Sequence, residues 1–110
     1  MNNKTFIPTG IITVIATTSI LPNRFITSAG AYASTTDKAI GVAMTGGGAG
    51  DAIAVCIHGI AIVETAAAVS SLNSEIRAST DGKAATASTP YLNILPLDTA
   101  ASGAFIRVKL

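Results

Sequence analysis

Cys56 and His58 come closest, among the residues of this 110-residue chain, to a pair that could do catalytic chemistry. They lie two positions apart in "AIAVCIHG", an alternation of small and β-branched residues that predicts a strand with both side chains on one face. A thiol and an imidazole act as nucleophile and base only within hydrogen-bonding reach, with a third group to orient the base. Neighbours on one face of a strand lie about 6–7 Å apart at the backbone, and no third group is evident. Because His58 is the only histidine, we expect this chain not to be an enzyme.

The chain also has few residues that could bind a metal ion or carry out catalysis with carboxylates. A structural zinc site takes four ligands of Cys or His type, and the chain has one Cys and one His. Four of the six acidic residues are aspartates in predicted turns, where carboxylates accept hydrogen bonds from nearby backbone N–H groups. We therefore expect no catalytic, cofactor-binding or metal-binding residues, and no cofactor.

The glycine-rich stretch "TGGGAGD" at 45–51 raises the question of a phosphate-binding loop. Such a loop needs a helix directly after its glycines, and the Walker pattern adds a Lys-Ser or Lys-Thr pair. Asp51-Ala52 stands at that place and a strand pattern follows. We interpret the stretch as a turn that returns one strand beside its neighbour.

The elements that would position these residues are almost all short strands. Thr, Ile, Val and Ala dominate, and turn residues recur every few positions, which is typical of a compact sandwich or barrel. We expect strands at 11–17, 24–27, 39–44, 52–58, 60–64, 75–78, 91–95 and 104–109. Asp-Gly in "STDGKA" at 79–84 predicts a hairpin, and 64–75 is the one stretch that could form a helical turn or two. The expected fold class is all-β, a compact β-sandwich or barrel built from two similar halves, with little or no helix.

A weak internal duplication supports the two halves. "GDAIAVCI" at 50–57 matches "GAFIRVKL" at 103–110, with glycine, isoleucine and valine at equivalent places 53 residues apart. One half alone would bury too little apolar surface to be stable. We expect a single β domain at 11–110, with the copies at about 24–59 and 76–110, and a flexible N-terminal arm at 1–10.

The composition favours an assembly component. Only 12% of the residues are charged and 49% are hydrophobic, with a net charge of +1, whereas an average soluble domain has about 25% charged residues. Low charge of this kind promotes association. We expect no nucleic-acid partner, because no basic cluster exists, and no membrane, because no stretch approaches the roughly 20 apolar residues of a spanning helix.

Several short motifs then follow one another in a characteristic order. They are Gly41-Val42-Ala43, Ala49-Gly50-Asp51, the segment from Val55 to Gly59, and Ser102-Gly103 through Arg107-Val108-Lys109-Leu110. Over roughly residues 20–110 this order resembles that of the capsid decoration proteins of tailed phages, also called cement or head auxiliary proteins. Lys109 departs from the family's terminal motif, and "SLNSEIRAS" stands where the family shows Gly-Asp.

The resemblance implies a virion protein on the outer capsid surface of a bacteriophage head, made in the bacterial host cytoplasm. It would bind and stabilise the lattice of the major capsid protein, commonly as a homotrimer. In that setting Asn2, Lys4, Phe6 and Ile7 are candidate capsid contacts of the arm. Arg107 and Lys109 alternate with apolar residues, as expected of a half-exposed edge or a subunit-interface strand.

The alternative is an exported small β binding module, such as an adhesin or a carbohydrate-binding domain. It requires a processed N-terminus, but Pro8, Gly10 and several threonines interrupt the apolar N-terminal stretch. It also requires an aromatic strip, but the aromatic residues are scattered, at Phe6, Phe25, Tyr32, Tyr91 and Phe105. The intact mass of the mature chain distinguishes the two interpretations.

Overall fold

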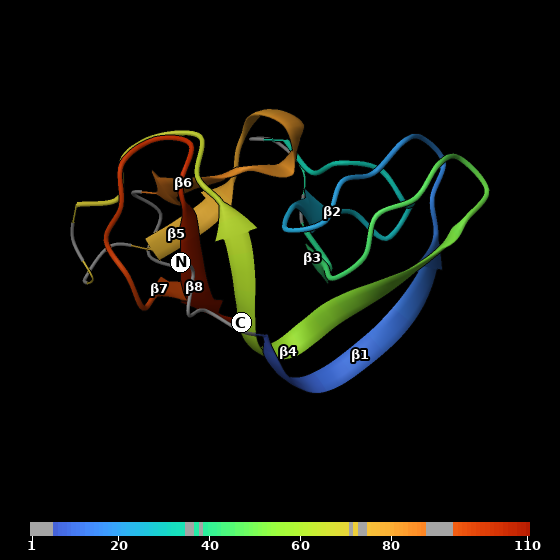
Figure 1. The fold of residues 1–110 in the computed structure, drawn as a ribbon, viewed down its shortest axis with the longest axis horizontal. Coiled ribbons are helices and arrows are strands. Elements are labelled where there is room, and N and C mark those ends of the chain that lie inside the picture. Colours follow the sequence, from blue (N-terminus) through green and yellow to red (C-terminus); the bar gives the residue numbers. More distant parts are fainter. Residues whose placement is uncertain (1–5, 35–36, 38, 71, 73–74, 88–93) are drawn as a thin grey trace.

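The computed structural model describes residues 6–34, 37, 39–70, 72, 75–87 and 94–110. The strands are β1 (Ile7–Ile15), β2 (Phe25–Ile26), β3 (Gly41–Ala43), β4 (Ala52–Glu64), β5 (Glu75–Ala78), β6 (Ala84–Ala87), β7 (Leu95–Pro96) and β8 (Phe105–Lys109). They form a curled six-stranded sheet and a separate two-stranded sheet of β5 and β6 (Figure 1). The helical structure in the described part of the chain is one 3₁₀ turn, Thr80–Gly82, so the predicted all-β class is confirmed. The predicted hairpin at 79–84 is confirmed too, since β5 and β6 pair across that turn.

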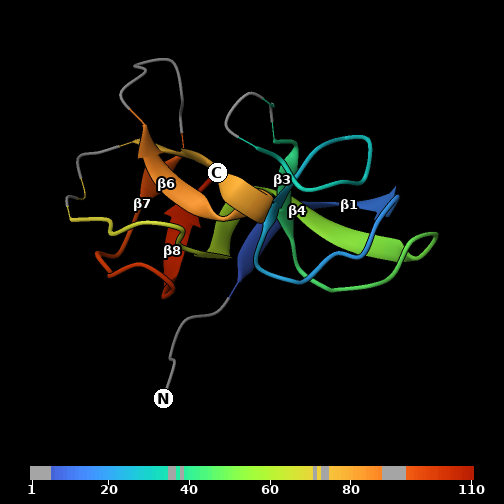
Figure 2. The same cartoon turned by 90° about the horizontal axis from the view of Figure 1, so that it is seen from above.

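β4 is a single bent strand where the sequence predicted two, at 52–58 and 60–64. The bend lies at Gly59, whose φ of +102° belongs to the region that favours glycine. A Cβ atom at Gly59 would lie 2.3 Å from the carbonyl oxygen of Ile7, because β1 crosses β4 closely here. Figures 1 and 2 show β1 and the first half of β4 as a curved ribbon that reaches away from β8.

The sheet has the order β2-β3-β4-β8-β7, and β1 pairs with β4. β8 therefore lies between β4 and β7, with both edges paired. The interpretation of Arg107 and Lys109 as residues of an edge strand is wrong, because β7 covers the edge that the sequence suggested was free. β1, in contrast, is an edge strand, since among the described strands it pairs only with β4.

The two ends of β4 are paired in corresponding ways. β1 aligns with the first half of β4 through five successive pairs, from Ile15↔Ala52 to Ile11↔Cys56. The second half of β4 aligns with β8 through five successive pairs, from Glu64↔Phe105 to Ile60↔Lys109. The buried pair Val14↔Ile53 thus corresponds to Val63↔Ile106.

Hydrogen bonds beyond these strands follow the same correspondence. Gly50 N–H donates to the Ala16 carbonyl at 2.7 Å, and Gly103 N–H donates to the Thr65 carbonyl at 2.9 Å. Two further pairs of segments exchange bonds in both directions, Ile20 with Gly47 and Val69 with Ala100. β1 with the first half of β4 therefore has the same local pairing as the second half of β4 with β8.

The core consists of two clusters of buried residues. The larger contains Phe25, Val42 and Cys56 together with other residues of β4, β5 and β8, so it packs the first and second parts of the chain against each other. The smaller lies inside the curved ribbon and includes Val14, Ile53 and Val55. Apolar residues on alternate positions of β1 and β4 thus hold the ribbon against the loops that it encloses.

Candidate interaction surface

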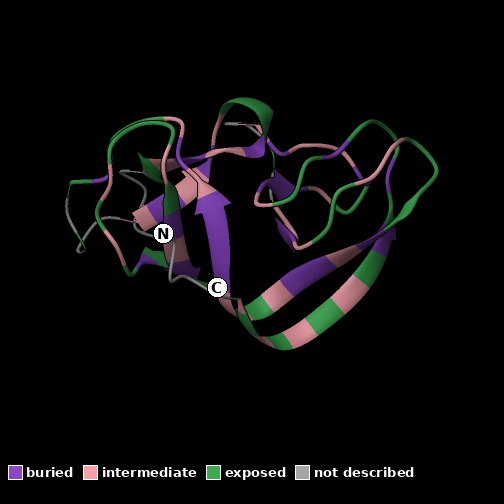
Figure 3. Cartoon of the chain, viewed as in Figure 1, coloured by how far each residue is buried: buried purple, intermediate pink, exposed green. Residues whose placement is uncertain are grey.

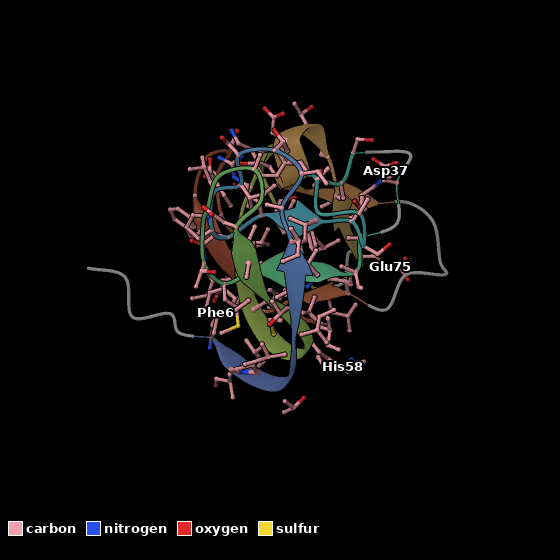
Figure 4. All side chains as sticks on the ribbon, turned by 90° about the vertical axis from the view of Figure 1, so that its right-hand side faces the viewer. Phe6, Asp37, His58 and Glu75 are labelled. Atoms are coloured by element: carbon pink, nitrogen blue, oxygen red, sulfur yellow. The ribbon has the colours of Figure 1, made fainter. Side chains whose placement is uncertain are left out.

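Cys56 and His58 do not form a catalytic pair in this structure. The Cys56 thiol is fully buried and donates a hydrogen bond to the backbone carbonyl of His58, 3.2 Å away, and not to its ring. Burial raises the pKa of the Cys56 thiol, and this outweighs the opposing effect of that hydrogen bond. His58 is exposed, and Figure 4 shows it well separated from Asp37 and Glu75. The thiolate that a nucleophile requires is therefore disfavoured.

The raised pKa of Cys56 gives a pH dependence with a definite sign. Below the pKa of the thiol in the unfolded chain, about 8.5, both states keep the proton and this contribution to stability is fully present. As the pH rises above that value, the unfolded chain loses the proton first, so the free energy of unfolding falls. Urea titrations from neutral to alkaline pH should show a steeper fall for the wild type than for Cys56→Ala.

Thiol labelling provides the companion measurement. We expect the native protein at neutral pH to react with a disulfide reagent far more slowly than the urea-unfolded chain, because the sulfur is covered. Equal labelling rates in the two states would contradict the burial that raises this pKa.

The glycine-rich stretch at 45–51 is a turn between β3 and β4, as predicted. Several of its N–H groups already have acceptors within the protein. Gly47 donates to the Ile20 carbonyl at 2.9 Å, and Gly48 donates to a carboxylate oxygen of Asp51 at 2.8 Å. Since these donors are used within the fold and a strand, not a helix, follows the glycines, this stretch has a structural role.

A polar junction holds the first part of the chain to the second. The Arg24 side chain, 10% exposed, lies 3.3 Å from a carboxylate oxygen of Glu64 and donates to the Asp81 carbonyl at 3.0 Å. Its guanidinium also lies 5.5 Å from the centre of the Tyr32 ring. Lys83 approaches the other carboxylate oxygen of Glu64 at 3.4 Å. These groups fix the hairpin after β5 against the segment before β2.

The predicted interface residues of β8 differ in how much charge they leave available. Arg107 makes a bidentate pair with Asp98, at 3.1 Å and 3.0 Å, and its backbone N–H donates to the same carboxylate at 2.9 Å. The side-chain hydrogen bond with Asp98 raises the pKa of Arg107. Lys109 is exposed. The sequence offered no signal for the Arg107–Asp98 pair, because a loop brings the two residues together.

The predicted arm lies partly outside the described residues, since Asn2 and Lys4 are not among them. Phe6 is partly buried and packs against the larger core cluster. Ile7 is the first residue of β1 and pairs with Ile60, so the boundary expected at residue 10 falls within a strand. Among the described aromatic residues of the alternative binding module, Phe25 is buried in the core and Phe105 is 41% exposed on β8, and Tyr91 lies outside the described residues.

The most distinctive surface feature is the outer face of β1. Ile7, Ile11 and Ile15 are 56%, 52% and 57% exposed, and β1 contains no charged residue. Figure 3 shows the exposed positions alternating along the strand, as the period of a strand requires. Sequence reasoning missed this face because it began the strand at Ile11 and could not show that one edge would lack a partner.

Other kinds of functional site have less support in the structure. A pocket of about 180 Å³, lined by residues that include Phe25, Ile57 and His58, is smaller than the roughly 300 Å³ at which ligand pockets usually begin. Within the described ranges no group of three or more His, Cys, Asp or Glu residues could hold a metal ion. A search of the described residues also finds no helix long and apolar enough to cross a membrane.

Comparison with known proteins gives a likeness among solved structures. No protein-family model matches the chain, and no curated protein matches it. Among solved structures, the head fiber gp8.5 N base in bacteriophage phi29 superposes with a TM-score of 0.73. The superposition covers 92% of this chain and 92% of that chain, at 14% sequence identity. A likeness at this identity shows that the two chains share a fold.

Proposed function

We propose that this chain is a structural protein of a bacteriophage head, which binds the outer capsid surface and stabilises the lattice of the major capsid protein. The observation that carries the proposal is the shared fold with the phi29 head fiber base over nearly the whole of both chains. The order of the short glycine and valine motifs, which resembles that of capsid decoration proteins, points the same way. In this proposal the chain is made in the bacterial host cytoplasm and acts as a homotrimer on the virion.

The physical basis of such a role is binding and not chemistry. A protein that binds the mature lattice and not its disrupted form stabilises the lattice by linkage. Three connected copies turn modest contacts into tight attachment, since the second and third contacts are intramolecular. The buried thiol of Cys56, and the separation of His58 from Asp37 and Glu75, fit a non-enzymatic role.

The N-terminal residues are the proposed capsid contacts, with Asn2 and Lys4 preceding the partly buried Phe6. A short segment ahead of an edge strand can add main-chain hydrogen bonds to a neighbouring sheet. Lys109, exposed on β8, remains a candidate contact between subunits, as the sequence predicted.

Co-sedimentation with heads tests the proposal. Heads from a phage that lacks this gene should bind the purified chain to saturation and then resist heat or chelator better than bare heads. Removal of residues 2–5 should weaken attachment about tenfold, because it removes one contact in each of several linked copies. His58→Ala, an exposed substitution, is the matched control and should bind as the wild type does.

Failure of the wild-type chain to co-sediment with bare heads would contradict the proposed function. Full binding by the shortened chain would contradict only the role of the N-terminal residues.

A further inference from the structure

In the second half of β4, the edge that faces away from β8 is covered by another part of the same chain. Glu64 N–H donates to the Asn23 carbonyl at 3.0 Å, and the Asn23 side-chain amide donates to the Ile62 carbonyl at 3.0 Å. These bonds lie on the side of β4 away from β8, and they satisfy backbone groups that an uncovered edge would leave to solvent. The edge is therefore closed by the segment that precedes β2.

The corresponding edge in the first part of the chain is that of β1. Ile15 pairs with Ala52 as Glu64 pairs with Phe105, so Ile15 N–H occupies the place of Glu64 N–H. By the same correspondence, the carbonyl of Thr13 occupies the place of the Ile62 carbonyl. In the part of the chain that the structure describes, no segment pairs with β1 on the side away from β4.

The side chains of β1 are also more exposed to solvent than those of the corresponding residues in β4. Ile11 and Ile15 are 52% and 57% exposed, whereas Ile60 and Glu64, their counterparts in β4, are only partly exposed. Natural proteins protect edge strands with charges, short length or coverage. β1 is nine residues long and uncharged, and its protective features, Pro8 and a register shift around Gly10, lie near its start, before Ile11. The free edge of β1 is therefore typical of a strand whose backbone groups are paired in an assembly.

We infer that β1 is the surface through which one copy of this chain binds a second copy. The second copy covers the edge at Thr13 and Ile15 as the segment around Asn23 covers the second half of β4. A second copy is the favoured occupant because the chain shows within itself how such an edge is closed, and because a protein with only 12% charged residues and a net charge of +1 tends to associate with its own copies. In the second part of the chain the hairpin of β5 and β6 takes the place of the hairpin after β2: Ala78↔Ala84 corresponds to Ile26↔Tyr32.

Such a contact is head-to-tail, since the edge of one copy meets a different surface of the next. Repeated contacts of this type generate a closed ring when the rotation closes. The inference deepens the self-association in the proposed function by naming its surface, and it does not require attachment to a head.

Sedimentation of charged variants tests this inference. The wild type should sediment as an oligomer. Ile11→Lys combined with Ile15→Lys should associate at least about tenfold more weakly, because covering the edge would partly desolvate two added charges and a charged edge disfavours strand pairing. Leu97→Lys is the matched control: Leu97 is 37% exposed directly after β7, which pairs with β8 and not with β1, and this variant should remain oligomeric. Circular dichroism should show an intact fold in each variant.

A second measurement serves if the lysine variant does not fold. Hydrogen exchange at the Ile15 amide of the wild type should slow as the protein concentration rises through the association range. A lysine variant that associates as tightly as the wild type, or an Ile15 amide indifferent to concentration, would overturn the role of β1 while self-association stands. A wild type that is monomeric at every concentration would overturn self-association itself, and head binding would still be decided by co-sedimentation.

Discussion

Replacing Gly59 with alanine is expected to lower the free energy of unfolding by about 4 kcal/mol or more, enough to unfold many domains of this size. Two costs combine at this position. Holding a non-glycine residue at a positive φ costs roughly 1–3 kcal/mol, and φ is +102° here. The added Cβ would also lie 2.3 Å from the Ile7 carbonyl oxygen and 2.7 Å from the Thr9 nitrogen, so β1 would have to separate from β4.

Gly103→Ala separates the two costs. Gly103 has a φ of +79°, but no atom lies within 4 Å of the place where its Cβ would be. Its replacement should therefore cost only about 1–2 kcal/mol. Urea unfolding of both variants measures the difference, and equal losses at the two positions would contradict the close crossing of β1 over the bend in β4.

Replacing Arg24 with methionine is expected to cost about 3 kcal/mol, because removing one member of a mostly buried ion pair leaves its partner poorly compensated. The change leaves Glu64 with Lys83 as its ion-pair partner and removes a donor from the Asp81 carbonyl. Methionine keeps much of the side-chain length, so the loss reports the charge and its hydrogen bonds more than the packing. Denaturant unfolding gives the value directly.

Lys83→Met is the matched control. Lys83 pairs with the same carboxylate, but its side chain is 32% exposed, compared with 10% for Arg24. Exposed pairs contribute about 0–1 kcal/mol, so this variant should be close to the wild type. A larger loss for Lys83→Met than for Arg24→Met would show that the junction does not depend on Arg24.

Features that depend on local sequence could be predicted. Asp81-Gly82 between two short apolar runs predicted the hairpin of β5 and β6, because a turn with positive φ at both residues suits this dipeptide. The strand predicted at 75–78 has the bounds of β5, and that at 104–109 is close to β8. Alternation of apolar residues around Val55 likewise predicted a strand whose buried face contributes to the core.

Features that depend on pairing between residues far apart in the sequence could not be predicted. Gly59 was interpreted as a break between two strands, since the sequence does not show that β1 and β8 pair with the two ends of one continuous strand. The same limitation led to the wrong assignment of β8 to an edge, because β7 is only two residues long and follows a loop. The exposed face of β1 could not be predicted either, because its isoleucines look like core residues and the sequence does not show that they lie on a face that the rest of the chain leaves exposed.

The proposed assembly connects these features with function. A curved ribbon of β1 and β4 presents an uncharged edge, the junction at Arg24 fixes the two parts of the chain relative to each other, and the low overall charge suits a protein largely covered by neighbours. A rigid chain of this kind would present the same surfaces in every copy, as a regular arrangement on a capsid requires.

A cryo-electron microscopy difference map between heads with and without this chain tests the central claim most directly. The account predicts added density on the outer surface of the shell, in clusters of copies that contact one another through β1. Added density that consists of isolated single copies would contradict the role of β1, and identical heads in the two maps would contradict the proposed function.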